Sequence, residues 1–168
     1  MNTRPAAPGD GIPAGTRIIA RPPGHPDAAS LLEELFREQT ARYGFADPPG
    51  LNPAEFTPPH GAFAVAYHHG VPAGCGGYRQ HDPGTVEIKK TYVTPARRGT
   101  GTGRALLAWL ERHAAAAGAR RAILETGVRN TAARRLFTAA GYKPVPGYVP
   151  GRDPAINRAY ARDLTRPA

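Results

Sequence analysis

The sequence predicts an α+β fold, in which a mixed, mostly antiparallel sheet of six to seven strands is flanked by about four helices. Three strand-like runs are separated by His69-Gly70 and by Asp82-Pro-Gly84, which are strong turn sequences, so these runs should form an antiparallel meander. Two helices with one apolar face follow, and the strand between them is of the parallel type. In chain order these six elements cover residues 62–68, 73–80, 85–93, 103–117, 121–126 and 130–140.

The remaining elements lie before the meander and after the last helix. A strand at 16–21 precedes a helix over 27–43, which carries several leucines on one face. Five prolines between positions 47 and 60 favour an irregular loop or a single helical turn around 52–56. Such a loop is either a lid over a pocket or a plain surface connection. A final pair of strands is expected at 142–145 and 155–164.

Chain length and the composition of the amino-terminal end predict a single domain. Residues 1–15 are rich in Pro, Gly and Ala and should form a flexible leader. The chain of 168 residues is long enough for one domain with a buried core and too short for two. We therefore expect one domain over residues 16–168.

The composition favours an anion-binding protein of the cytoplasm. The formal net charge of +9 makes the surface cationic, which suits anionic ligands such as nucleotide phosphates. The arginines are scattered along the chain, which argues against specific nucleic-acid binding. Cys75 is the only cysteine, so no intrachain disulfide can form, and no cysteine–histidine spacing suggests a metal site. No apolar run approaches the roughly 20 residues of a membrane-spanning helix, and we expect no membrane partner.

A loop with a glycine at every second position, from Arg98 to Arg104, joins the third strand of the meander to the next helix. Glycines let consecutive N–H groups converge on an anion, and the start of the helix adds its dipole. The loop ends Gly103-Arg104-Ala105 and so lacks the Gly-Lys-Ser/Thr of a Walker loop, and its period of two differs from Gly-x-Gly-x-x-Gly. Either the loop is a phosphate cradle or it is only a turn.

A second motif extends from Ile123 to Tyr142 and is predicted to form a strand, a loop and a helix with a defined end. Asn130 is a good N-cap, and Gly141 stands where a left-handed residue would end the helix. The apolar residues between them repeat at helical spacing, at Ala133, Leu136, Phe137 and Ala140.

These two motifs, in this order, resemble the GNAT superfamily of N-acetyltransferases. The order Arg98-x-x-Gly101-x-Gly103 resembles its acyl-CoA loop, and the stretch from Asn130 to Tyr142 is similar to its later motif, Asn-x-x-Ala-x-x-Leu-Tyr-x-x-x-Gly-Phe/Tyr. The resemblance extends over roughly residues 16–164 and is greatest to small bacterial-type acetyltransferases, mostly of unassigned substrate.

The resemblance implies a sheet that splays between the strands ending near Val93 and Thr126, with the thioester of acetyl-CoA in the gap. It also implies transfer of an acetyl group to a primary amine of a small molecule, amino acid or peptide, by direct attack in a ternary complex. The residues that should bind acetyl-CoA are Tyr92, Val93, Arg98, Gly99, Thr100, Gly101, Thr102, Gly103, Arg104, Asn130, Ala133 and Phe137. Asn130 can cap its helix and contact acetyl-CoA at once.

A base is needed because an alkyl amine, with a free pKa near about 10, is mostly protonated at neutral pH. Glu87 is our candidate, since it lies six residues before Val93 and shares a face with Lys89, Thr91 and Val93 if the strand is regular. The alternative is that Glu87 only pairs with a lysine or arginine. Lys89 and Lys90 could bind an acidic group on the acceptor.

The sequence departs from the family pattern at Phe137, which stands at the position of a tyrosine that donates a proton to the departing thiolate. Either the thiolate leaves without a dedicated acid, or Tyr142, our first candidate, or Tyr148 or Tyr92 replaces the missing hydroxyl, or activity is reduced.

Acceptor contacts are expected from the first helix and the closing segment. The candidates are Glu38, Arg42, Tyr43 and Tyr148, with Arg152 nearby. A non-enzymatic alternative is a CoA-binding sensor or interaction domain with weak or no catalysis. Either a monomer or a homodimer is compatible with the sequence.

Overall fold

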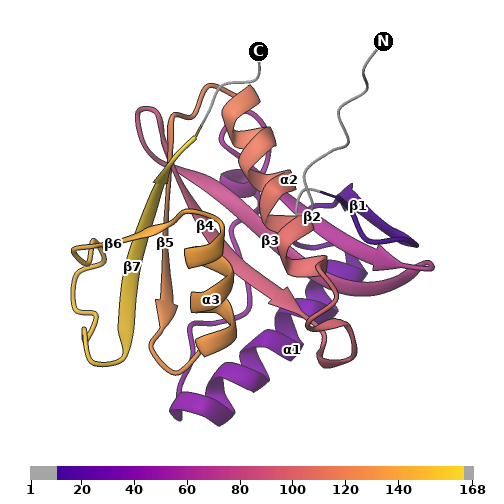
Figure 1. The fold of residues 1–168 in the computed structure, drawn as a ribbon, viewed down its shortest axis with the longest axis horizontal. Helices are drawn as coiled ribbons and strands as arrows, with labels where there is room; N and C mark the ends of the chain where they lie inside the picture. The colour runs from indigo at the N-terminus through magenta and orange to yellow at the C-terminus, as the bar shows by residue number, and fades with distance from the viewer. Residues whose placement is uncertain (1–10, 165–168) are drawn as a thin grey trace.

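Residues 11–164, which the computed structural model describes, form a seven-stranded sheet with three α-helices and two short 3₁₀ helices (Figure 1). The strands are β1 (Thr16–Ala20), β2 (Gly61–His68), β3 (Val71–Asp82), β4 (Thr85–Val93), β5 (Arg121–Gly127), β6 (Lys143–Val145) and β7 (Asn157–Asp163). The helices are α1 (Pro26–Tyr43), η1 (Pro53–Phe56), η2 (Pro95–Arg97), α2 (Thr102–Ala116) and α3 (Thr131–Ala139). Most of the expected leader, residues 1–10, lies outside the described residues.

The strand order is β1-β2-β3-β4-β5-β7-β6, and β4 with β5 is the one parallel pair among the described strands. The mixed, mostly antiparallel sheet predicted from the sequence is therefore confirmed, including the meander β2-β3-β4. Three of the expected helices are α-helices. The fourth, in the proline-rich segment, is the single 3₁₀ turn η1, whose N-cap Asn52 accepts a hydrogen bond from the Ala54 N–H at 3.2 Å.

Helix α1 covers one face of the sheet. It begins where the His25 ring accepts the Asp27 N–H, and it ends at Gly44, whose φ of 81° suits glycine. Its buried leucines pack in one cluster with Phe56 of η1 and Phe63 of β2. Helices α2 and α3 cover the other face (Figure 1), where their buried residues join a larger cluster with β4, β5 and β7. The buried residues of the two helices include Leu106, Leu107, Leu110 and Phe137.

Strand β4 contains a bulge at Lys90, whose φ is 59°. The pairing of β4 with β3 shifts register at this point, between Cys75 and Gly77 of β3. A bulge adds one residue to a strand, so every later side chain changes to the opposite face of the sheet.

The predicted common face of Glu87, Lys89, Thr91 and Val93 is therefore wrong beyond Lys89. The Thr91 side chain lies on the α2 side, where its Cγ2 would be 3.1 Å from a Cβ placed on Gly76, next to side chains of α2. Tyr92 instead belongs to the cluster around α1. The sequence Lys89-Lys-Thr-Tyr-Val93 suits a regular strand and gives no sign of the extra residue.

Pairing between β4 and β5 stops at Ile88 and Leu124. On its other side β5 stays paired with β7 as far as Gly127 and Asn157. The ends of β4 and β5 therefore diverge, which confirms the splay that the family resemblance implied, and the gap between them holds the candidate site.

Replacing Gly77 by alanine should destabilise the fold, because a Cβ there would lie 2.5 Å from the Phe63 ring and 2.9 Å from the Ala62 carbonyl oxygen. We expect a loss of about 1–3 kcal/mol in the free energy of unfolding, measured by urea denaturation. Gly50→Ala is the matched control, since no atom lies within 4 Å of its added methyl group. Equal stability of the two variants would contradict the close packing of β3.

Candidate active site

Two adjoining cavities lie where β4 and β5 separate. The loop cavity, of about 300 Å³, is lined by the η2–α2 loop, the end of β4 and α3. The splay cavity, of about 140 Å³, is lined by the end of α1, the loop after it, β4, β5 and Arg152. The residues that line both are Leu35, Arg42, Thr91, Asn130, Ala133 and Phe137. Molecules bound in the two cavities would therefore meet at the splay.

The loop before α2 has the geometry of an anion cradle. Gly99 and Gly101 adopt φ values of 73° and 90°, which glycine reaches without strain. Gly101 is the N-cap of α2 and offers its first turn no side-chain acceptor, so the N–H groups there suit an external anion. Gly103 lies against Leu136 and Val93, where an added Cβ would make ordinary contacts at 3.4 Å.

Arg98 ties this loop to α1. Its Nε donates to the Val93 carbonyl oxygen at 3.0 Å, and its Nη2 lies 2.7 Å from Oε1 of Glu38. The guanidinium carbon also lies 5.7 Å from the centre of the Tyr92 ring. The Arg98 charge therefore sits at the wall of the loop cavity, balanced by Glu38.

Asn130 and Phe137 of the α3 segment stand between the two cavities. Asn130 caps α3, because its Oδ1 accepts the Ala133 N–H at 3.1 Å. Phe137 is 3% exposed and packs edge-to-face on Tyr142, with the ring centres 5.8 Å apart. The capping role predicted for Asn130 is confirmed, and its position is compatible with a second role toward a ligand.

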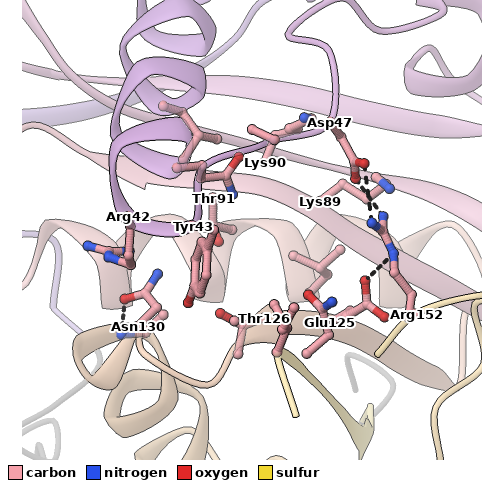
Figure 2. A pocket seen from close by; sticks show the side chains of 18 of the residues that line it. Arg42, Tyr43, Asp47, Lys89, Lys90, Thr91, Glu125, Thr126, Asn130 and Arg152 are labelled. Atoms are coloured by element: carbon pink, nitrogen blue, oxygen red, sulfur yellow. Dashed lines mark hydrogen bonds and ion pairs between the residues drawn. The ribbon is translucent and has the colours of Figure 1, made fainter. Parts of the chain in front are cut away.

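Arg152 joins two carboxylates at the splay cavity, as Figure 2 shows. Its Nη2 donates to Oδ2 of Asp47 at 2.6 Å, and its Nε lies 3.1 Å from Oε1 of Glu125. The hydrogen bond from Arg152 holds the pKa of Asp47 below its ordinary value, whereas burial raises the pKa of Glu125. This cluster connects the loop after α1, the end of β5 and the β6–β7 loop.

The sequence matches the acetyltransferase (GNAT) family over residues 28–142, which is more than half of the chain. The chain belongs to the GNAT family of acetyltransferases. Members of this family use acetyl-CoA as a co-substrate, so the enzyme class expected from the sequence is confirmed.

Individual relatives agree with this assignment. An IAA acetyltransferase of Azospirillum brasilense is 34% identical over 139 residues, which cover 81% of this chain and 91% of the relative. An uncharacterised N-acetyltransferase of Schizosaccharomyces pombe is 30% identical over 141 residues, covering 81% and 85%. A proposed acyl-CoA N-acyltransferase from Klebsiella pneumoniae has a similar structure, with a TM-score of 0.76 at 25% identity over 89% of this chain and 98% of the other.

The loop cavity of this GNAT enzyme contains most of the residues expected to bind acetyl-CoA. Those that line it are Tyr92, Val93, Arg98, Gly99, Gly101, Gly103, Arg104, Asn130, Ala133 and Phe137. Thr100 and Thr102 do not line it. Thr102 is buried, and its hydroxyl lies 3.0 Å from that of Thr100, which donates to the Arg97 carbonyl oxygen. The two threonines thus shape the loop through their side chains, while the first turn of α2 has no side-chain cap.

The residues expected to contact the acceptor do not all line the same cavity. Arg42 and Tyr43 line the splay cavity, whereas Glu38 lines the loop cavity. Tyr148 lines neither cavity, but its hydroxyl donates to Oε2 of Glu87 at 2.7 Å. Tyr43 fits only because position 127 is glycine, since a Cβ there would overlap the Tyr43 hydroxyl.

Glu87 lines the splay cavity, as expected, and is 4% exposed. Its Oε1 accepts from Arg79 Nε at 3.0 Å, and Lys89 Nζ lies 4.0 Å away. With Tyr148 on Oε2, both of its oxygens are occupied. The ion-pair alternative for Glu87 is therefore realised in the structure.

Tyr142, the first candidate for the missing acid, lies in the core instead. It is 2% exposed, belongs to the cluster under α2 and lines neither cavity. Burial, followed by the Glu111 carboxylate, raises its pKa. We therefore do not retain Tyr142 as the acid, because its side chain lines neither cavity.

Two carboxylates that line the splay cavity, Glu125 and Asp47, were not predicted as site residues. Glu125 stands at the end of a strand before a turn-like segment, a position that could have marked it as a site residue. Asp47 lies in the proline-rich segment, and no local pattern distinguishes it from other loop aspartates. Between residues 11 and 164, no cluster of three or more His, Cys, Asp or Glu residues could hold a metal, and no helix could span a membrane.

Replacing Gly101 by alanine should weaken acetyl-CoA binding. A side chain at φ 90° is strained, so the loop must change its backbone path and move the N–H groups of the first turn. We expect at least a tenfold rise in the Kd of acetyl-CoA by isothermal titration calorimetry. Gly50→Ala, at a residue that lines neither cavity, should bind as the natural chain does, and unchanged affinity in Gly101→Ala would show that the loop is only a turn.

Proposed function

We propose that this enzyme transfers the acetyl group of acetyl-CoA to the primary amine of a small molecule, amino acid or peptide by direct attack in a ternary complex. The observation that carries the proposal is the pair of adjoining cavities, which share six lining residues at the splay. One cavity has the anion cradle, and the other has a charged wall. Two substrates held side by side gain from proximity without a covalent enzyme intermediate.

The described residues also argue against an acetyl-cysteine intermediate. Cys75 is fully buried, and its thiol donates to the Lys90 carbonyl oxygen at 3.5 Å. Burial raises the pKa of the thiol, which leaves little thiolate at neutral pH. A buried, reduced cysteine also agrees with the cytoplasmic location that we propose.

Acetyl-CoA would lie with its pyrophosphate on the first turn of α2 and its pantetheine arm along the loop cavity, near Asn130. The Val93 N–H, or a close neighbour on the splayed edge of β4, would receive the thioester oxygen as it becomes negative. When bound, acetyl-CoA supplies the activated acyl group. The chain itself orients the thioester and excludes water by packing Phe137 between the cavities.

The acceptor would occupy the splay cavity, whose volume of about 140 Å³ admits a small molecule or the end of a side chain. Lys89 and Lys90 line this cavity, as does Arg152. Burial lowers the pKa of Lys90, whose Nζ donates to the Pro48 carbonyl oxygen at 3.3 Å. These cations support an acceptor that carries an acidic group beside its amine.

Thermal unfolding with acetyl-CoA, followed by a thiol-release assay, tests this function. A ligand at about 100 times its Kd adds about 2.7 kcal/mol to the stability. We expect that stabilisation, and then CoA thiol release with at least one amine among the L-amino acids, putrescine and a lysine-containing peptide. Stabilisation without thiol release would favour a CoA sensor, and no stabilisation at millimolar acetyl-CoA would refute the proposal.

Restoring a hydroxyl by Phe137→Tyr should raise kcat severalfold, provided that protonation of the thiolate limits turnover. Phe137 lines both cavities, so a hydroxyl at its tip would lie beside the splay. The measurement is steady-state thiol release, with the Kd of acetyl-CoA as control for intact binding. An unchanged kcat would mean that the thiolate leaves without a dedicated acid.

A further inference from the structure

We infer that Glu125, rather than Glu87, takes the proton from the acceptor ammonium group. The inference rests on the proposed function. Glu125 is the first residue of β5 beyond its last pair with β4, Ile88 with Leu124, so it stands at the edge of the splay. Its side chain lines the splay cavity, and Figure 2 shows it there beside Thr126 and Arg152.

Glu87 is poorly suited to accept a proton. Arg79 places Nε and Nη2 within 3.0 Å of its Oε1, while the Tyr148 hydroxyl lies 2.7 Å from its Oε2. A second carboxylate, Glu55, holds the same Arg79 at 2.9 Å. Protonating Oε1 of Glu87 would oppose the donor-only Arg79, and protonating Oε2 would force the Tyr148 hydroxyl to change from donor to acceptor. Either change removes a charge-assisted hydrogen bond from a buried carboxylate, which is costly.

One carboxylate oxygen of Glu125 is available to accept a hydrogen bond. Its Oε1 lies 3.1 Å from Arg152 Nε, and its Oε2 forms no hydrogen bond with any residue between 11 and 164. The side chain is 14% exposed, so a small amine can reach it while bulk water is largely excluded. A base needs an accessible lone pair within hydrogen-bond reach of the amine, and Glu125 provides one.

Burial and the neighbouring charges act on the pKa of Glu125, and burial has the largest effect. Burial raises its pKa above the ordinary value, Arg152 and then Lys89 lower it, and Glu87 and Asp47 raise it. The remaining charged or titratable groups that line the same cavity are Arg42 and Tyr43 of α1 and Lys90 of β4. A base whose pKa lies closer to neutrality accepts the proton of an ammonium group more readily.

Arg152 positions Glu125 without fully neutralising it. Both of its terminal nitrogens are held by Asp47, at 2.6 and 3.3 Å, which leaves Nε as its contact with Glu125. The Arg152 charge is thus shared by two carboxylates. Arg152 is a positioning residue, and Glu125 is the catalytic residue.

The reaction balances with this assignment. The ammonium group gives one proton to Glu125, and the neutral nitrogen attacks the thioester carbon. The C–N bond forms, the C–S bond breaks, and the sulfur leaves with the bonding pair. A second proton leaves the nitrogen as the amide forms and protonates the thiolate, and Glu125 returns the first proton to water.

Glu125→Gln tests the inference through the pH dependence of thiol release, measured with the fastest amine of the panel above. At pH 7 we expect kcat about 100-fold lower, with the Kd of acetyl-CoA within twofold of the natural chain. The defect should shrink as the pH rises toward the amine pKa of about 10, because the acceptor then arrives deprotonated. Glu125→Asp, which keeps a carboxylate, should retain part of the activity at pH 7.

Glu87→Gln and Glu33→Gln are the comparison variants. Glu33 is exposed on α1 outside both cavities, so Glu33→Gln should behave as the natural chain does. Glu87→Gln should lose stability but keep the pH profile of the natural chain. A pH-independent defect in Glu125→Gln, or a pH-dependent one in Glu87→Gln alone, would overturn the inference. Absence of thiol release by the natural chain with every amine would refute the proposed function itself.

Discussion

The separation of β4 from β5 after Ile88 and Leu124 is the constraint on which the whole site depends. Paired strands lie about 4.8 Å apart, which leaves no room for a substrate between them. The bulge at Lys90 shifts β4 by one residue against β3, while β5 stays paired with β7 as far as Gly127. Beyond this point the facing N–H and C=O groups of β4 and β5 are not paired with each other. The backbone of the two strands therefore forms part of the wall of the site.

The bulge also distributes the side chains of β4 between the two faces. Before it, Glu87 and Lys89 point toward the α1 side and the splay cavity. After it, Thr91 and Val93 point toward α2, which leaves the α1 side to Tyr92. One extra residue thus changes the side chains of β4 from charged, at Glu87 and Lys89, to largely apolar beyond the bulge.

The sequence predicts those parts of the site that depend on residues close together in the chain. The η2–α2 loop depends on glycine spacing and a helix start, so its geometry follows from positions 98–104 alone. The helices and most strand limits follow from apolar periodicity in the same way. The bulge at Lys90 could not be predicted, because a positive φ at a lysine is imposed by the strands and helices packed around it. Tyr142 matched the sequence pattern of a site residue, yet the turn at Gly141 directs it into the core.

The splay cavity depends on contacts between segments that are distant in the sequence. Its charged cluster therefore could not be predicted from local sequence patterns. Arg152 and Asp47 are 105 positions apart, and Glu125 completes the cluster from a third segment. Two carboxylates on neighbouring strands, Glu87 and Glu125, acquire different properties only through these partners. Glu87 accepts hydrogen bonds from Arg79 of β3 and from Tyr148 of the β6–β7 loop. Glu125 instead contacts Arg152, whose terminal nitrogens are bound to Asp47. The loop cavity is therefore encoded largely by local sequence, whereas the splay cavity depends on contacts between distant segments.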